Sequence, residues 1–330
     1  MTERTEGSSR SSLSGRRVLV TEGAGFLGPT LCRALSERGA WVYAVSRQVE
    51  PGEENGVLWL RADFSNLTDV ETILTTVHPE VVFHLAEFGN GRSELDLVVP
   101  TFESNLASTV NLLTTVARQG PVRVILAGSM EEPLAADEVA SSPYAVTKWA
   151  SSQYSRMFHA LYNVSAVIAR IFMAYGPGYQ DQRKLLPFVI RSLLQGKVPE
   201  LPTGERAIDW IFVEDVVEGL LRLAEADGLE GETVDLGSGE LITVRRLVER
   251  VVDLVGSPLT PRFGTVEDRP FEMANVADAE ATFRLLGWRP PTPLTFGLQK
   301  TIAWHTKQLA QGSANGEKSD HAWRLIPEGR

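Results

Sequence analysis

Tyr144 and Lys148 are the residues of this sequence whose types and spacing best suit acid–base chemistry. They stand four residues apart in a stretch expected to be helical, so their side chains share one face, one turn apart. A phenol with a pKa of about 10 is a poor acid–base group at neutral pH, but a neighbouring ammonium favours the phenolate. The pair is therefore suited to exchange a proton with a hydroxyl or carbonyl while a hydride moves elsewhere. Tyr and Lys also occur by chance with this spacing on solvated helices. The surrounding elements therefore decide whether the pair is catalytic.

A glycine-rich turn joins the first predicted strand, residues 17–21, to a helix predicted over 26–38. Backbone amides in such a turn approach a pyrophosphate, which then lies at the positive end of the helix. Glu22 stands where the usual spacing has a glycine, and its carboxylate either weakens cofactor binding or alters the path of the loop. The predicted dinucleotide-binding loop comprises Gly23, Gly25, Phe26, Leu27 and Gly28.

The next two predicted strands, residues 41–46 and 57–62, end in residues that suit the adenosine half of a dinucleotide. Ser46 and Arg47 stand where an acidic residue would bind the ribose of NAD, and a hydroxyl with an arginine suits the extra phosphate of NADP. NADP is therefore favoured over NAD, unless Arg47 is only a solvated charge. Asp63 is suited to accept from the adenine amino group while Phe64 packs its ring; the alternative for Asp63 is a helix cap.

Strands alternate with helices through the first half of the chain, with further strands predicted at 81–86, 122–128 and 165–171. This alternation predicts an α/β protein with a Rossmann-type, doubly wound parallel sheet and right-handed crossovers. The expected organisation is a disordered N-terminus (1–14), a dinucleotide-binding domain (15–175), a smaller C-terminal α/β substrate lobe and a polar tail (310–330). The lobe is expected mainly over 176–309, with strands able to return to the sheet.

Composition narrows the class of protein. A net charge of −10 over 330 residues argues against a nucleic acid or an anionic membrane as the main ligand. The single cysteine, Cys32, excludes an internal disulfide, and the five histidines show no metal-ligand spacing, so no metal is expected. No stretch approaches the ~20 apolar residues of a membrane span. The sequence therefore favours a cytoplasmic protein.

Several motifs in order identify a family resemblance: the glycine loop, Asp63, His84-Leu85-Ala86, Asn105, Ser129 and the Tyr144/Lys148 pair. The second half adds Tyr-Gly-Pro-Gly at 175–178, an Asp-Trp pair at 209–210, Leu-Gly-Ser-Gly at 236–239 and Leu-Gly-Trp-Arg-Pro at 286–290. Over about residues 16–307 the chain resembles the extended short-chain dehydrogenase/reductases, and within them the NAD(P)-dependent nucleotide-sugar epimerase/dehydratase/ketoreductase group.

The resemblance implies a role for each matching residue. Tyr144 would be the acid–base residue, Lys148 would lower its pKa and bind the nicotinamide ribose, and Ser129 would hydrogen-bond the reacting oxygen. Leu85 and Ala86 would line the cofactor cleft. The resemblance also implies a homodimer through a four-helix contact that includes the Tyr144 helix.

At the positions expected to contact the sugar, the sequence differs from the pattern of the group. Dehydratases of the group place an Asp-Glu pair after the serine or threonine, whereas Met130 and Glu131 follow Ser129 here. Met130 cannot be a general acid, so dehydration is disfavoured; Glu131 either helps enolise a keto sugar or holds a loop. Ile208 replaces the arginine that often holds the diphosphate. The expected substrate-binding residues are Met130, Glu131, Lys184, Arg206 and Arg269.

These features predict an NAD(P)-dependent oxidoreductase acting on a nucleotide-diphosphate sugar, by hydride transfer at carbon 4. A 4-ketoreductase is the leading hypothesis, because exchangeable NADPH suits net reduction. The main alternative is a 4-epimerase that retains its cofactor, and a dehydratase ranks third. A non-catalytic dinucleotide-binding protein is the remote alternative, supported only by Glu22 and the altered phosphate residues.

Overall fold

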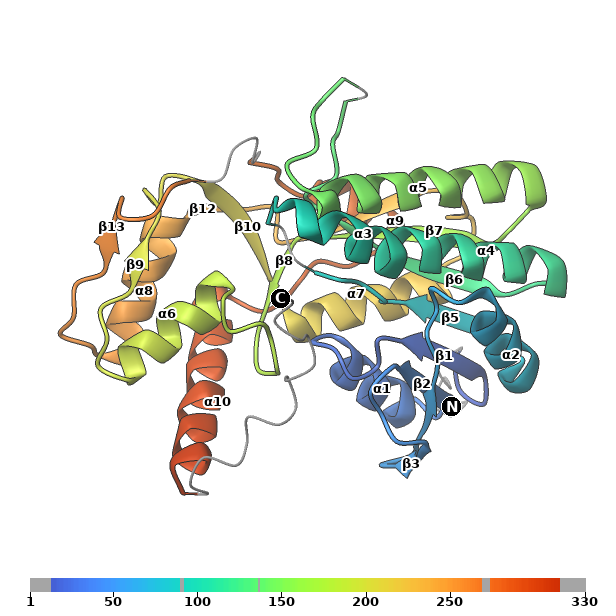
Figure 1. Ribbon diagram of the computed structural model, residues 1–330, viewed down its shortest axis with the longest axis horizontal. Coiled ribbons are helices and arrows are strands. Elements are labelled where there is room, and N and C mark those ends of the chain that lie inside the picture. Colours follow the sequence, from blue (N-terminus) through green and yellow to red (C-terminus); the bar gives the residue numbers. More distant parts are fainter. Residues whose placement is uncertain (1–12, 90–91, 136, 269–273, 315–330) are drawn as a thin grey trace, which may run out of the picture. The chain divides into compact units, whose positions relative to one another are not determined.

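The computed structural model describes residues 13–89, 92–135, 137–268 and 274–314 of the chain (Figure 1). Its contacts divide the chain into two compact units. Unit 1 comprises the described residues within 1–174, 208–241 and 269–291, and unit 2 those within 175–207, 242–268 and 292–330. The substrate lobe expected over 176–309 is thus interrupted twice by segments that return to unit 1.

Unit 1 is built on an eight-stranded sheet of order β11-β7-β6-β5-β1-β2-β4-β3. All pairs are parallel except β3 with β4, and β1 lies between β2 and β5, with Val20 opposite both Ala44 and Phe83. The strands are β1 (Arg17–Thr21), β2 (Trp41–Ser46), β3 (Gly52–Glu54), β4 (Val57–Arg61), β5 (Val81–His84), β6 (Arg123–Ser129), β7 (Ala166–Ile171) and β11 (Thr233–Leu236). This is the Rossmann-like α/β architecture that the alternation of strands and helices predicts.

The central strands are apolar on both faces because helices cover both sides of the sheet. Every residue of β5 is buried, as are the last four of β1. Two groups of helices do the covering: α2 contacts α4 and α4 contacts α5, whereas α1 contacts α7. The helices of unit 1 are α1 (Gly28–Glu37), α2 (Leu67–Val77), α3 (Val98–Thr101), α4 (Ser108–Gln119), α5 (Pro143–Tyr162), α7 (Val213–Glu225) and α9 (Ala279–Leu286), with a 3₁₀ turn, η1 (Leu95–Leu97).

Helix α5, which carries Tyr144 and Lys148, has a well-defined beginning. The Ser142 side chain accepts a hydrogen bond from the amide of Ala145 (3.1 Å), and Pro143 occupies the first helical position. A capping serine satisfies an amide that has no partner within the helix, and proline there loses none. The phase of α5, and hence the direction of Tyr144, is set at this cap.

The sequence predicts one helix over about residues 100–118, whereas the structure has three consecutive segments there. Helix α3 continues into a π-helical segment, η2 (Phe102–Ala107), before α4 begins. π-helical turns widen the helix locally and are frequent at functional sites. Here the segment carries Asn105, which is buried and contacts α5 by a hydrogen bond to Thr147 (3.1 Å).

Unit 2 is mainly helical. Helix α6 (Leu185–Leu194), α8 (Val244–Val255) and α10 (Leu294–Ala314) contact one another, and β9 (Glu200–Leu201) pairs with β13 (Arg262–Phe263). The borders between the units fall within β8 (Met173–Tyr175) and β12 (Leu241–Thr243) and at the start of β10 (Ala207–Phe212), which pair in the order β12-β10-β8.

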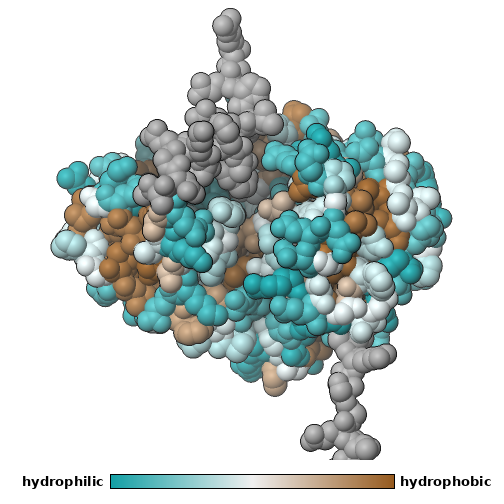
Figure 2. All heavy atoms as spheres, turned by 90° about the horizontal axis from the view of Figure 1, so that it is seen from below, coloured by the Kyte–Doolittle hydropathy of each residue, from teal (hydrophilic) through white to brown (hydrophobic). Residues whose placement is uncertain are grey.

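Polar and apolar residues are mixed on the face seen in Figure 2. None of the helices described is both long and apolar enough to cross a lipid bilayer.

Candidate active site

A cleft in unit 1 lies at the carboxyl ends of β1, β2, β4 and β5. The chain proceeds outward from β1 through β2 and β4 on one side, and through β5, β6 and β7 on the other. Crevices at such a switch point are where open α/β sheets bind nucleotides. Five of the predicted cofactor residues line this cleft: Ser46, Arg47, Asp63, Phe64 and Ala86. Leu85 is buried directly before Ala86.

The predicted glycine loop, Gly23 to Gly28, connects β1 to α1 beside this cleft. Gly28 allows a close approach of the chain to itself, because a Cβ there would lie 2.4 Å from the Gly23 carbonyl oxygen. A turn hydrogen bond joins the Gly25 amide to the Glu22 carbonyl (2.9 Å). Phe26 and Leu27 complete the turn into α1, whose amino end then faces the loop.

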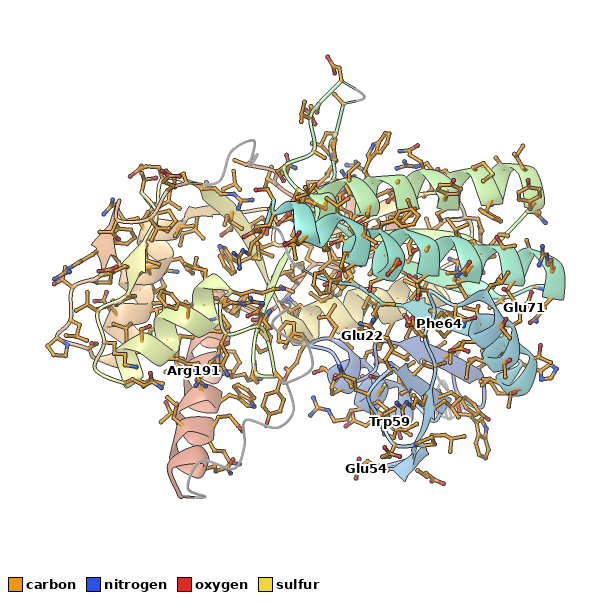
Figure 3. All side chains as sticks on the ribbon, in the orientation of Figure 1. Glu22, Glu54, Trp59, Phe64, Glu71 and Arg191 are labelled. Atoms are coloured by element: carbon orange, nitrogen blue, oxygen red, sulfur yellow. The ribbon has the colours of Figure 1, made fainter. Side chains whose placement is uncertain are left out.

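Glu22 takes a backbone conformation that glycine adopts freely and glutamate rarely does, with φ of 54°. Its side chain lies over the loop, since a Cβ on Gly25 would be 2.8 Å from Glu22 Cγ. Burial raises the pKa of Glu22; Arg47 opposes this rise and Glu87 adds to it. Glu22 therefore places a carboxyl group above the amides that a pyrophosphate would approach. Figure 3 shows Glu22 and Phe64 from this region of unit 1.

The contacts of Asp63 show whether it caps the following helix, the alternative that the sequence left open. Asp63 does not cap α2; the cap is Asn66, which accepts from the Thr68 amide (2.9 Å). Asp63 instead accepts from the amide and hydroxyl of Ser65, at 3.0 and 2.8 Å. The Phe64 ring is largely buried, 6.1 Å from the ring of His84, so little of it is open to a base.

Tyr144 and Lys148 lie together near the end of β6, where Ser129 stands. Lys148 is buried, and its Nζ donates to the Ala127 carbonyl (2.9 Å) and lies 5.7 Å from the centre of the Tyr144 ring. Ser129 is also buried. The structure thus brings all three predicted catalytic residues into one cluster within unit 1.

Glu87 is a fourth member of this cluster that sequence reasoning missed. Its Oε2 accepts a hydrogen bond from the Tyr144 hydroxyl (3.2 Å) and pairs with Lys148 Nζ (2.9 Å). It also lines the cleft at the carboxyl ends of the strands, directly after Ala86. A glutamate immediately after His84-Leu85-Ala86, at the carboxyl end of a central strand, is the signal that could have identified it.

The pKa of Tyr144 moves in the direction opposite to the expected one. Burial of the hydroxyl raises this pKa well above its usual value, and the carboxylates of Glu87 and Glu131 raise it further. A hydrogen bond with Ser129 acts in the other direction. Lys148 Nζ, which was expected to lower this pKa, is paired with Glu87 Oε2 at 2.9 Å, so part of its charge is compensated. The surroundings of Tyr144 therefore favour the protonated phenol.

The segment after β6 is held by its own hydrogen bonds. Buried Glu132 accepts from the Ser129 amide (2.7 Å) and the Ser152 hydroxyl (2.8 Å), and Ser129 Oγ accepts from the Glu131 amide (3.1 Å). Met130 is buried, so its side chain is directed into the protein. Glu131 is close enough to Tyr144 to influence its pKa.

The predicted phosphate-binding residues fall elsewhere in the chain. Lys184 is exposed immediately before α6, and Arg206 is half-buried with its carbonyl accepting from the Val244 amide (2.9 Å); both belong to unit 2. Arg269 lies outside the described residues. Among the residues that the structure describes, no group of three or more His, Cys, Asp or Glu side chains could hold a metal ion.

Comparison with known proteins agrees with this architecture. A UDP-glucuronate 4-epimerase of Thermodesulfobacterium geofontis is 25% identical over 88% of this chain and 96% of its own. A probable dTDP-glucose 4,6-dehydratase of Sinorhizobium fredii is 27% identical over 88% of this chain and 92% of its own. The Bordetella bronchiseptica enzyme WbmF, solved in complex with NAD⁺ and UDP, is 25% identical with a TM-score of 0.79, covering 92% of this chain and 96% of that one.

The model of the NAD dependent epimerase/dehydratase family matches residues 18–237, two thirds of the sequence. The match includes the glycine loop, the cleft and the Ser129, Tyr144 and Lys148 cluster. The chain is therefore a member of the NAD-dependent epimerase/dehydratase family.

Proposed function

We propose that this protein is a 4-ketoreductase of nucleotide-diphosphate sugars, which transfers a hydride from NADPH to carbon 4. In this reaction Tyr144 donates a proton to the developing alkoxide and Ser129 stabilises that oxygen. Lys148 holds the nicotinamide ribose, and Gly23 to Gly28 hold the pyrophosphate.

The observation that carries the proposal is the hydrogen bond that the Tyr144 hydroxyl donates to Glu87 Oε2 (3.2 Å). A carboxylate acceptor stabilises the protonated phenol, which is the form that donates a proton in reduction, whereas oxidation needs the phenolate as base. A reaction that begins by reducing a ketone needs this donor before anything else. Oxidation of an alcohol must first remove the phenolic proton.

The test is a panel of UDP- and dTDP-linked hexoses and their 4-keto forms, each with NADPH and with NADH, followed at carbon 4 by NMR. We expect a 4-keto sugar to be reduced with stoichiometric consumption of NADPH. Turnover by protein that retains its cofactor and needs no added NADPH would contradict the proposal.

A 4-epimerase is the second candidate, favoured by the 4-epimerase named among the relatives. It would oxidise carbon 4, allow the 4-keto sugar to rotate in the site, and reduce the opposite face of the carbonyl with the same cofactor. The NMR panel separates the two, because only epimerisation interconverts two alcohols without net oxidation of cofactor.

NADP is the proposed cofactor form, supported by Ser46 and Arg47 in the cleft. Arg47 is exposed and influences the pKa of Glu22, so its guanidinium is near the glycine loop. We expect Arg47→Ala to weaken NADPH binding by about tenfold and NADH binding much less, because only NADPH carries the extra phosphate. Fluorescence titration with both cofactors checks this, and equal losses would contradict an NADP role for Arg47.

The remaining assignments complete the proposal. Met130 and Glu131 are assigned to the sugar, and Lys184, Arg206 and Arg269 to its diphosphate, since guanidinium groups bind phosphates bidentately. A homodimer through α5 is supported by exposed apolar residues on one face of that helix, Val146, Tyr154 and Leu161. Light scattering of the purified protein tests the dimer. A cytoplasmic location, supported by the single buried thiol of Cys32, is tested by cell fractionation.

A further inference from the structure

The carboxylate of Glu87 stands at the centre of the catalytic cluster, and nothing in the reaction proposed above uses it. One oxygen, Oε2, contacts both the Tyr144 hydroxyl (3.2 Å) and Lys148 Nζ (2.9 Å). The same side chain lines the cofactor cleft. A carboxylate in direct contact with the acid–base tyrosine can itself exchange a proton with it.

Glu87 is held in place from both sides along the chain. Before it, the amides of Leu85 and Ala86 both donate to Thr21 Oγ1, at 3.0 Å each. After it, the amide of Phe88 donates to Asn105 Oδ1 (2.6 Å). These bonds fix the backbone on which the carboxylate is carried.

Asn105 also ties this segment to the helix that carries Tyr144. Its Nδ2 donates to Thr147 Oγ1 (3.1 Å), whose hydroxyl donates to the Tyr144 carbonyl (2.9 Å). The π-helical segment η2 places Asn105 between the two. A chain of buried and partly buried hydrogen bonds therefore supports the backbone on both sides of the contact between Glu87 and Tyr144.

Glu87 also reaches water. About 33% of its side chain is exposed, against 4% for Lys148. Its other oxygen, Oε1, lies against Gly89, where a Cβ would be only 2.7 Å away, so the glycine leaves room for the carboxylate. One side of Glu87 thus faces Tyr144 while the side chain remains open to solvent.

We propose that Glu87 is the proton-relay and positioning residue that returns a proton from solvent to Tyr144 after each reduction. The inference rests on the proposed ketoreductase function. The hydride forms the new C–H bond as the carbonyl π bond breaks and NADP⁺ is released, and the Tyr144 O–H bond breaks as the alkoxide gains its proton. Glu87 then takes a proton from water and gives it to the Tyr144 phenolate, which restores the phenol and the carboxylate.

The charges of the cluster suit this sequence of steps. In the resting state Lys148 stabilises the Glu87 carboxylate, so the proton resides on Tyr144. Once Tyr144 has become a phenolate, a second anion stands beside Glu87 and favours its transient protonation. An epimerase needs no such relay, because the proton that Tyr144 removes in the first half-reaction is returned in the second.

The experiment compares the first turnover with later ones in Glu87→Gln. The amide preserves the size of the side chain but cannot carry the proton. With the 4-keto sugar nucleotide selected by the panel, stopped-flow measurement of NADPH oxidation should show a first turnover close to the wild-type rate. Later turnovers should be slower by about 100-fold, the scale of acid–base catalysis, because Tyr144 is reprotonated slowly.

Rescue and control variants separate a relay from a structural role. Formate should restore the later turnovers of Glu87→Ala, because it supplies the missing carboxylate. Glu54→Gln removes a negative charge from the exposed strand β3, away from the cleft, and should leave the ratio of first to later turnovers unchanged. Equal slowing of all turnovers in Glu87→Gln, or no slowing of any, would overturn the inference.

A second measurement does not depend on turnover. The pKa of Tyr144, followed by the ¹³Cζ signal of labelled tyrosine and assigned with Tyr144→Phe, should fall in Glu87→Gln, since Lys148 then lacks its counter-charge. Glu131 and Glu22 remain in place in this variant. An unchanged pKa would show that the two groups are not in contact. If wild-type protein reduces no 4-keto sugar nucleotide of the panel with NADPH, the proposed function fails whatever the pKa of Tyr144 does in Glu87→Gln.

Discussion

Two carboxylates line the same cleft of this protein, Glu22 at the pyrophosphate end and Glu87 at the catalytic end, and their surroundings differ. Glu22 stands on a left-handed backbone and lies over Gly25, where the cofactor's phosphates are expected. Glu87 is paired with Lys148 and accepts from Tyr144. Burial is the largest influence on the pKa of Glu22, ahead of Arg47 and Glu87, whereas Glu87 itself has an ammonium partner.

The comparison shows that the effect of a buried acid depends on the charges beside it. Burial raises the pKa of Glu22, Arg47 opposes this rise, and Glu87 adds to it. At the catalytic end Lys148 pairs with Glu87, and the pKa of Tyr144 is raised, first by burial and then by the carboxylates of Glu87 and Glu131. The first carboxyl is expected to hinder cofactor binding, and the second to serve proton transfer.

The largest effect in this comparison is expected at the catalytic end. Tyr144→Phe removes the phenolic proton that both Ser129 and Glu87 contact, and we expect kcat to fall by about 10²–10⁴-fold. Cofactor affinity should be retained, because the glycine loop and Lys148 are intact. Steady-state kinetics with a cofactor titration checks this, with Tyr154→Phe on the exposed side of α5 as the control. Substantial activity in Tyr144→Phe would place the acid–base group elsewhere.

An intermediate effect is expected at the pyrophosphate end. Glu22→Gly relieves the left-handed strain and removes a carboxylate from the phosphate site. We expect the free energy of unfolding to rise by about 1 kcal/mol, because the strain relieved exceeds the extra chain entropy of glycine. Cofactor affinity should rise by about tenfold. Chemical denaturation and cofactor titration measure the two effects.

Asn55→Gly is the matched control for that change. Asn55 is also left-handed, with φ of 52°, but lies in the exposed turn between β3 and β4. Asparagine tolerates this conformation better than glutamate does, so a smaller gain in stability and no change in cofactor affinity are expected. Equal behaviour of the two variants would mean that Glu22 has no special influence on the phosphate site.

The smallest effect is a pH dependence that belongs to Glu22. Because its folded-state pKa is raised above 4.5, the penalty of burying its charge is absent below that value and complete above the raised pKa. Cofactor affinity should therefore increase, by about threefold to tenfold, as the pH falls through the raised pKa and the carboxylate becomes neutral.

Glu22→Gln should remove most of this pH dependence. Its cofactor affinity should stay at the low-pH value of the wild type over the whole pH range. Glu54→Gln on the exposed strand β3 makes the same change of charge away from the cleft and should leave the dependence intact (Figure 3). Affinity that is independent of pH in the wild type would mean that the carboxyl moves aside when the cofactor binds.

Elements with strong periodicity were predictable from the sequence to within a residue or two. The sequence predicts helices over residues 67–77 and 185–194 and a strand over 233–236, and α2, α6 and β11 have these bounds. The prediction of secondary structure failed where tertiary contacts determine the local backbone conformation. The segment over residues 100–118 contains a π-helical turn, and the short elements β3 and α9 were not anticipated, because neither has enough residues to establish a period.

The sequence by itself indicated the family through its motifs and the parallel sheet through the alternation of strands and helices. It also placed Tyr144 beside Lys148, because a four-residue spacing on a helix is a local property, whereas Ser129 was assigned from the family resemblance. Only the tertiary structure decided the state of that cluster. Glu87 is 57 residues from Tyr144 in the chain, and the two meet because β5 and β6 pair side by side and α5 packs against β6. A pKa depends on every charge and buried surface around the group, so its direction follows from the folded neighbourhood and not from the spacing of two residues.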